Sequence, residues 1–235
     1  MRTAASIRLR PWPSLRRHQN SSRRGVAALE FALLSPMLIL MLMSMYDIAN
    51  GWLTWRRMAA AAGSVGQIAT MLAVNADGTN SLTYDLAWRA STAVYASMPQ
   101  LLMPSARYGV ILTEVQFSAP ANCGKASCVA SVAWSRALLG TGAAPRPCGV
   151  LTAVADSAPP GPAVLAQSAF QAAPVLVVDV TYAFKPLFLG GVVGAIQMAR
   201  SAYYPARSGS LDQSIAYLDP FFQCPAYVPP KNKDD

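Results

Sequence analysis

The sequence predicts an α+β protein in which a long N-terminal transmembrane α-helix continues into an exported domain built on an antiparallel β-sheet. Three observations lead to this fold class. An apolar run of membrane-spanning length follows a strongly basic segment, a helical pattern continues beyond that run without proline, and the second half of the chain changes to the period-two pattern of strands. About 190 residues follow the run, which is enough for one domain with its own core.

The predicted membrane helix is the run from Val26 to Met45. It contains 20 residues with a single charge, that of Glu30, and at a rise of ~1.5 Å per residue it spans a hydrocarbon core of ~30 Å. A cleaved secretory signal usually has an apolar core of roughly 7 to 15 residues and an A-x-A-like site, whereas this run is longer and leads into YDIANGW. Paired arginines at 16–17 and 23–24 leave twin-arginine export as a minor alternative.

Residues 1–25 form a basic leader with seven arginines, His18 and no Asp or Glu. The positive-inside rule therefore places the N-terminus in the cytoplasm and the chain beyond the run across the membrane. The leader accounts for +7 of the formal net charge of +8, which leaves +1 for residues 26–235. A nucleic-acid partner is not predicted, because phosphate binding needs Lys and Arg clustered on the folded surface.

The helical pattern continues from the membrane run to about residue 73. Apolar side chains recur at spacings of three and four, which predicts one packed face made of Ile48, Trp52, Trp55, Ala59 and Ala62. Trp52 and Trp55 fit interfacial anchors and core residues equally well. Gly63 and Gly66 either weaken the helix or permit close packing.

The exported α+β domain is predicted over residues 74–235. A turn-rich loop at 74–81 precedes a second helix that ends near Ser97, before Pro99. Strands are predicted at RYGVILTEVQF and CVASVAWSRAL, which form a hairpin, and at PVLVVDVTYAF, with ARSAYYPAR as its candidate partner. The apolar stretch 186–199 has two adjacent glycines and is too short for a second span, so a buried or interfacial position is favoured.

No enzyme, metal or cofactor is predicted. The only histidine lies in the leader, which excludes Ser-His-Asp and Cys-His sites and His-ligated zinc in the exported part. The glycine motifs of nucleotide-binding loops and nucleophile elbows are also missing. Paired carboxylates remain as a poor route to a hydrolase, because the exported acids fit solvated or capping groups, and Asp179 is expected to point outward from a half-exposed strand.

Four cysteines, Cys123, Cys128, Cys148 and Cys224, all follow the membrane run. An even number in an oxidising compartment predicts two disulfides, and the spacing does not match a zinc ribbon. The first two cysteines flank the loop of the predicted hairpin, so we expect them to pair and to leave Cys148 for Cys224. Four cysteines allow three connectivities.

Glu30 is the unusual residue of the membrane run. A carboxylate at membrane depth costs up to a few kcal/mol and is usually kept for a partner. If the chain is cut between Gly25 and Val26, Glu30 becomes the fifth residue of a mature chain whose new α-amino group is a nearby positive charge, on the same helix or on a neighbour's. The alternative is that Glu30 only reaches the lipid headgroups.

Gly25, followed after four residues by Glu30-Phe31 and a long apolar run, resembles the processing site of type IV prepilins and, more closely, of the pseudopilins of the Tad (tight adherence) pilus. GVAALEFALLSPMLILML, with Pro36, and the small-residue segment RRMAAAAGSVGQIA are similar to the TadE-like pattern. SVAWSRA and VTYAFKPLF also look like exported domains of that family. Phe31 stands where the major Flp pilins usually have tyrosine, and the exported domain is much larger than theirs, so the resemblance implies a minor pseudopilin with a type IV pilin-like fold. TadF-like and TadG-like proteins share this architecture.

The resemblance implies that a prepilin peptidase cuts after Gly25 and that the product takes part in assembly or priming of a Tad/Flp-type pilus, which serves adhesion. Its implied partners are the peptidase, other pilins and pseudopilins, the Tad inner-membrane assembly platform and membrane lipid. The implied location is a bacterial inner membrane with a periplasmic C-terminal domain, and incorporation into an extracellular pilus is left open. The alternative functions are a membrane-anchored periplasmic binding or sensor module and, less favoured, a tethered hydrolase.

Overall fold

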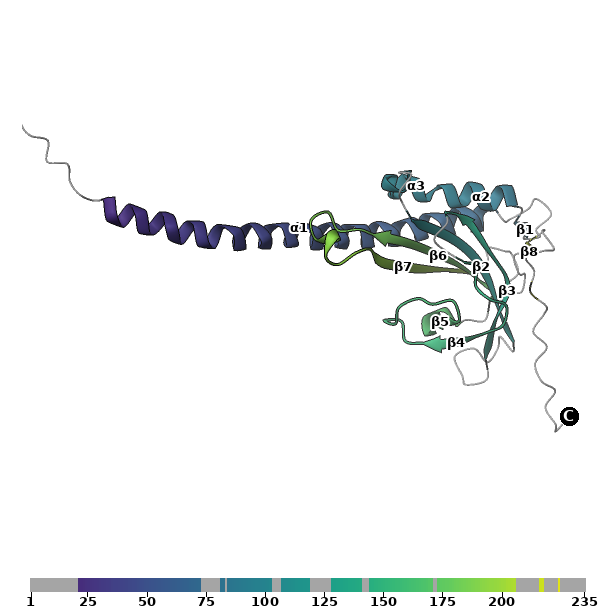
Figure 1. The fold of residues 1–235 in the computed structure, drawn as a ribbon. Coiled ribbons are helices and arrows are strands. Elements are labelled where there is room, and N and C mark those ends of the chain that lie inside the picture. Colours follow the sequence, from purple (N-terminus) through teal and green to yellow (C-terminus); the bar gives the residue numbers. More distant parts are fainter. Residues whose placement is uncertain are drawn as a thin grey trace, which may run out of the picture. The chain divides into compact units, whose positions relative to one another are not determined.

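The computed structural model describes residues 21–72, 81–82, 84–102, 107–118, 128–140, 144–170, 173–205, 216–217 and 224. The helices are α1 (Ser21–Leu72), α2 (Tyr84–Thr92) and α3 (Val94–Ser97), with 3-10 turns η1 (Pro99–Leu102), η3 (Gln167–Ala169) and η4 (Leu189–Gly191). The strands are β1 (Ser81–Leu82), β2 (Tyr108–Ser118), β3 (Val129–Leu139), β4 (Val150–Val154), β5 (Val164–Ala166), β6 (Val175–Phe184), β7 (Ile196–Pro205) and β8 (Ala216–Tyr217). Figure 1 shows these elements along the chain.

The chain divides into two compact units, Met1–Met45 and Tyr46–Asp235, and α1 runs from the first into the second. Within the described residues, α1 is the one helix with the length and composition to cross a membrane, and its most apolar window has no buried residue. Pro36 lies inside this helix and has no N–H to donate to the carbonyl of Ala32. The predicted long apolar N-terminal helix is confirmed.

The second unit contains a six-stranded sheet in the order β5-β4-β3-β2-β6-β7. Its neighbouring strands are antiparallel except for the parallel pair of β4 and β5. The two hairpins expected from the sequence are present, because β2 pairs with β3 and β6 pairs with β7. The α+β fold class with an antiparallel sheet is therefore confirmed. A separate two-stranded sheet of β1 and β8 and the strands β4 and β5 were not predicted.

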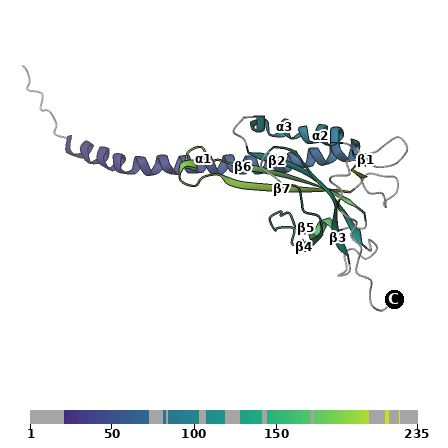
Figure 2. The same ribbon diagram turned by 45° about the vertical axis from the view of Figure 1, so that its right-hand side comes forward.

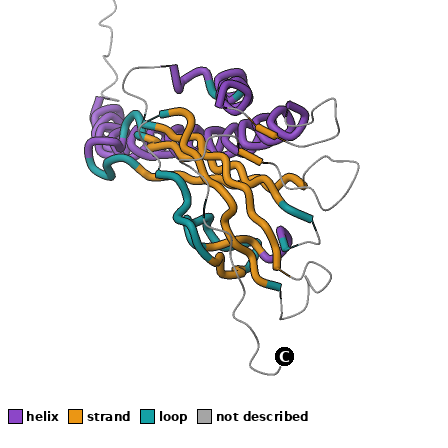
Figure 3. The backbone as a smooth tube through the Cα atoms, turned by 90° about the vertical axis from the view of Figure 1, so that its right-hand side faces the viewer, coloured by secondary structure: helices purple, strands orange, loops and turns teal. Residues whose placement is uncertain are grey.

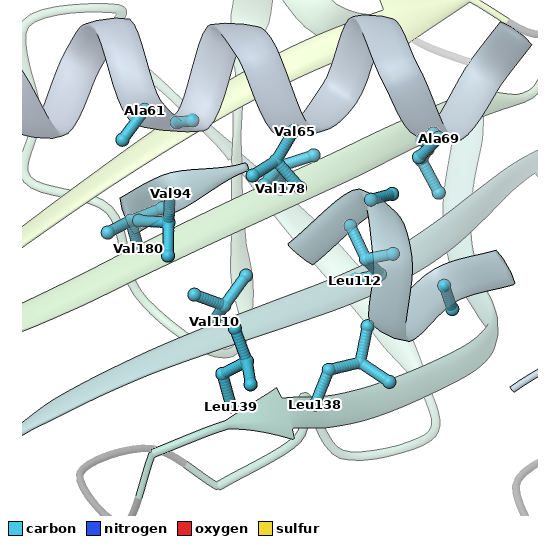
Figure 4. Close-up of a cluster of buried hydrophobic side chains, with 14 of the residues drawn as sticks. Ala61, Val65, Ala69, Val94, Val110, Leu112, Leu138, Leu139, Val178 and Val180 are labelled. Atoms are coloured by element: carbon cyan, nitrogen blue, oxygen red, sulfur yellow. The ribbon is translucent and has the colours of Figure 1, made fainter. Parts of the chain in front are cut away.

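One face of the sheet is covered by the second half of α1 and by α2 and α3, as Figures 1 and 2 show for this unit. Figure 4 shows the apolar side chains that meet there. The helices contribute Ala61, Val65, Ala69 and Val94, and the strands contribute Val110, Leu112, Leu138, Leu139, Val178 and Val180. Full burial of one such valine or leucine stabilises the fold by ~1.5–3 kcal/mol, so this layer is the main core of the unit.

The sheet curls, so that its strands β4 and β5, together with η3, cover the opposite face of the central strands β3, β2 and β6. A second core cluster forms there, with buried members that include Val132, Leu151, Leu165 and Val177. Figure 3 shows the helices on one side of the strands and the β4 and β5 segment on the other. The central strands are therefore buried on both faces, which explains the near-continuous apolar run of β6.

The face of α1 predicted to pack is displaced by one residue at Ile48 and Trp52, although the predicted Ala62 is buried. Ile48 is 71% and Trp52 58% exposed, and the buried side of the second half carries Asp47, Gly51, Thr54, Met58, Ala61, Ala62, Val65 and Ala69. The reason is that small and polar residues occupy the contact side. A Cβ atom added at Gly51 would lie 3.4 Å from the ring of Phe184, so this glycine is in close contact with the sheet. Because the contact side includes such small residues, a search for large apolar side chains does not identify it.

Candidate functional site

The predicted processing and pairing residues lie near the start of α1. The helix already includes residue 25, and Val26, Glu30 and Phe31 are exposed on it. Glu30 follows Val26 by four positions, which places the two residues on the same helical face one turn apart. Among the described residues none forms a hydrogen bond or ion pair with Glu30. The carboxylate therefore has the position needed to meet the α-amino group that cleavage before Val26 would create, or a partner from another chain.

The second feature is a tie between α1 and the loop joining β6 to β7. Asp47 is only 4% exposed, and its Oδ1 accepts a hydrogen bond from the N–H of Leu187 at 2.8 Å. Its Oδ2 accepts two more, from Phe188 at 3.0 Å and from Leu189 at 2.8 Å. The ring of Phe188 also packs edge-on against Tyr46, with centroids 5.6 Å apart. One carboxylate thus fixes the loop to the first turn of α1 in this unit.

The third feature is a buried ion pair between Arg146 and Asp179. Arg146 Nε donates to Asp179 Oδ2 at 2.7 Å and Nη2 donates to Oδ1 at 3.0 Å, a bidentate arrangement. Nη1 donates to the carbonyl of Val164 at 2.8 Å, and the hydroxyl of Ser201 donates to Asp179. The pair therefore joins the loop after β3 to β5, β6 and β7. A structural clamp accounts for all of these contacts.

The prediction that Asp179 points to solvent is wrong. The alternation along β6 does place it on the face opposite the helices, but Arg146 and the β4 and β5 segment cover that face, so Asp179 is only 8% exposed. Glu114 is also buried, 1% exposed, and accepts a hydrogen bond from Trp134 Nε1 at 2.6 Å. These acids were expected to be solvated. Their burial could not be read from the local sequence, because the segments that cover them lie far away in the chain.

Metal ligation finds no support in the part of the chain that the structure describes, since no group of three or more His, Cys, Asp or Glu there lies close enough to hold an ion. The described cysteines form disulfides. Cys148 forms a disulfide with Cys224, with Cα atoms 5.4 Å apart, and the N–H of Cys224 donates to the carbonyl of Ala133 at 2.7 Å. Cys128 is also disulfide-bonded, and Cys123 lies outside the described residues, so the pairing of those two stays a prediction.

Tyr95 and Asp156 are among the side chains whose pKa is shifted by their surroundings. Burial and a 2.5 Å hydrogen bond with the hydroxyl of Tyr108 raise the pKa of Tyr95 to about 12. Hydrogen bonds from the backbone and side chain of Ser168 hold the pKa of Asp156 below its ordinary value. Neither group lies in a constellation of acids, bases and nucleophiles, and both fit local structural roles.

Comparison with known proteins bears on the N-terminal segment. Residues 25–65 match the family model described as TadE-like protein, a segment that makes up less than a fifth of the 235 residues. No curated protein and no solved structure matches the chain. The family match indicates a component associated with the Tad pilus. The resemblance to TadE-like proteins is thereby confirmed for the segment that carries Gly25, Glu30 and Phe31.

Proposed function

We propose that this protein is a minor pseudopilin that takes part in assembly or priming of a Tad/Flp-type pilus after prepilin-type cleavage between Gly25 and Val26. The observation that carries the proposal is the match to TadE-like proteins, which begins at Gly25 and continues past the membrane run. The exposed apolar helix that contains this segment supports a membrane anchor. The separately folded second unit supports a protein that presents a sizeable domain outside the membrane.

The geometry of α1 supports a specific role for Glu30 within this proposal. Cleavage converts Val26 into a cationic N-terminal residue one helical turn from the carboxylate, and a helix N-terminus also favours nearby negative charge. An opposite charge within the low dielectric of a bilayer repays much of the cost of keeping Glu30 there. The amine that binds Glu30 belongs to its own helix or to that of an adjacent subunit, and Phe31 lies beside this contact.

The partners proposed on this basis are the prepilin peptidase, which must reach the bond after Gly25, and the other pilins, pseudopilins and assembly platform of the Tad system. The basic leader supports a position of that bond at the cytoplasmic face of the inner membrane, which would make the second unit periplasmic. No part of the proposal requires a catalytic site in this chain. The buried carboxylates Glu114 and Asp179 are engaged by Trp134 and Arg146.

Replacement of the charge at position 30 tests the proposal. Glu30→Gln keeps the size and removes the charge, so we expect normal membrane insertion and cleavage but loss of incorporation into the pilus. The matched control is Asp85→Asn, which removes an exposed carboxylate that pairs with Arg89 in the second unit and is expected to leave assembly unchanged. Pilus formation and co-purification with other pilins are compared at equal membrane levels. Normal assembly of the Glu30→Gln protein would refute the pairing role.

A further inference from the structure

The loop between β6 and β7, residues 185–195, displays large apolar side chains to solvent. The exposed fractions reach 67% for Leu187, 45% for Phe188, 88% for Val192 and 56% for Val193, and 42% for Ile196 at the start of β7. The same end of α1 exposes Tyr46, Ile48 and Trp52. A cluster of this kind on a folded domain marks a surface that contacts something apolar.

The contacts between α1 and the hairpin of β6 and β7 fix where this loop lies along the helix. Tyr204 packs at Gly66, the guanidinium of Arg200 lies 4.7 Å from the ring centroid of Trp55, and Met198 lies beside Gly51. Going back along β7 from Tyr204 to Met198, toward the loop, the contacts move along α1 from Gly66 to Gly51. The loop itself is hydrogen-bonded to Asp47.

Asp47 lies two residues after the apolar run that ends at Met45. At ~1.5 Å per residue it is ~3 Å along the helix from that end, whereas the headgroup region on each side of a bilayer is roughly 5–7 Å deep. The loop is therefore held at the level of the bilayer surface. Three hydrogen bonds from consecutive N–H groups to the one carboxylate of Asp47 hold the loop in this position.

The surface of the domain changes from apolar to basic along α1, away from the apolar run. Next to the loop an apolar groove of about 510 Å³ is lined by Ile48, Trp52, Phe184, Leu189, Val193 and Ile196. Its charged lining residue is Asp47, whose two oxygens are occupied by the loop's own backbone. One turn beyond Trp52 the guanidinium of Arg56 lies 5.3 Å from the indole centroid, and Arg57 and Arg200 follow at the same level or farther.

We infer that the loop 185–195 is a membrane-surface anchor whose apolar side chains insert into the lipid bilayer that α1 crosses. Large apolar side chains at the boundary between headgroups and acyl chains are typical of interfacial membrane segments. The inference rests only on the membrane helix and is independent of the proposed pilus function.

The anchor restricts how the exported domain stands on the membrane. A single membrane-spanning helix can spin about its own axis and tilt in the bilayer, and the domain that packs on its second half moves with that half. A second contact at the loop, offset from α1, holds one face of the domain against the lipid surface. The hydrogen bonds to Asp47 keep the loop in place while the side chains of Val192 and Val193 reach into the bilayer.

Membrane retention cannot test this contact, because α1 alone keeps the chain in the bilayer, so the test uses a local reporter. The full chain carries the photoreactive residue p-benzoylphenylalanine at Val192 and is reconstituted in nanodiscs of phosphatidylethanolamine and phosphatidylglycerol. The matched control carries it at Val150, which is 49% exposed on β4. After illumination, mass spectrometry quantifies lipid adducts and protein adducts. Circular dichroism and the Cys148–Cys224 disulfide check that both proteins are folded.

We expect lipid adducts at Val192 to exceed those at Val150 by roughly tenfold, since interfacial apolar residues lie within the headgroup and acyl boundary. Asp47→Asn loses acceptor capacity toward the loop N–H groups, so it should lower the lipid yield at Val192 several-fold. Equal yields at the two positions would overturn the inference. Adducts at Val192 that are mainly with a second copy of the chain or with another protein would overturn it as well, by assigning the surface to a subunit contact.

Discussion

The two halves of α1 are both rich in apolar residues but differ in how much of their surface the rest of the chain buries. In residues 26–45 nearly every side chain is exposed, and the single carboxylate, Glu30, has no partner among the described residues. In residues 46–72 one side is buried against the sheet, and the carboxylate Asp47 is fully hydrogen-bonded within its own domain. The first half therefore presents an apolar surface that the described part of its own chain does not cover, whereas the second half is packed against its own domain.

The largest expected effect concerns Asp179, a buried carboxylate in the domain that packs on the second half of α1. Asp179→Asn leaves the charge of Arg146 buried without a counter-ion, which costs about 3–5 kcal/mol of unfolding free energy. Glu30→Gln, the corresponding change in the other region, should leave the unfolding of the exported domain unchanged. Chemical denaturation of the full chain in detergent micelles, followed by tryptophan fluorescence, measures both.

A double substitution separates loss of the charge pair from loss of packing. Asp179→Leu combined with Arg146→Met replaces the pair by apolar side chains, and such replacements are often neutral or stabilising. We expect the double variant to be more stable than Asp179→Asn alone. If Asp179→Asn unfolds at the wild-type denaturant concentration, the clamp does not contribute to stability and the contrast with Glu30 is lost.

Two glycines sharpen the comparison within the second half of α1. A Cβ atom at Gly66 would lie 2.2 and 2.3 Å from ring atoms of Tyr204, whereas at Gly63 it would meet only the hydroxyl of that residue at 3.3 Å. Overpacking costs ~1–3 kcal/mol, and alanine gains up to ~1 kcal/mol over glycine inside a helix. Gly66→Ala should therefore destabilise the domain by about 1–2 kcal/mol, while Gly63→Ala should be neutral or stabilising. Equal denaturation midpoints for the two variants would contradict close packing at Gly66.

The smallest effect is a pH dependence of the domain alone. The folded state raises the pKa of Tyr95 to about 12, above the ordinary value of ~10 for tyrosine. The associated stability is present below pH ~10 and is lost as the pH rises toward 12, because the unfolded chain releases this proton first. Tyr95→Phe should weaken the loss of stability over this range, and fluorescence-monitored denaturation at several pH values tests it. A slope identical to that of the wild type would show that another group is responsible.

The parts of the fold that follow from local pattern could be predicted, and those that depend on distant partners could not. A long apolar run with a single charge identified the candidate membrane helix. Period-two alternation identified β2, and runs rich in β-branched and aromatic residues identified β3 and β6. The packed side of α1 was displaced by one residue, because it is defined by Asp47 and Gly51, whose contacts lie about 140 residues away. No local signal marks Arg146 in its Pro-rich loop as the partner of Asp179.

The candidate site divides in the same way. The spacing from Gly25 to Glu30 and Phe31 is a local motif, and it identified the segment that matches TadE-like proteins. The tie between Asp47 and the loop 185–195 could not be found from sequence, because it consists of backbone N–H donors that any residue provides. The apolar stretch 186–199 was correctly not assigned as a second span, since it forms η4 and the start of β7.

The N-terminus of the mature protein shows whether the first half of α1 is processed for assembly with other subunits. The full chain is expressed in cells with an active prepilin peptidase, purified from the membrane fraction and sequenced from its N-terminus. The account predicts a mature chain that begins at Val26, and it predicts that Gly25→Leu blocks this cleavage. A chain that still begins at Met1 in those cells would contradict the account.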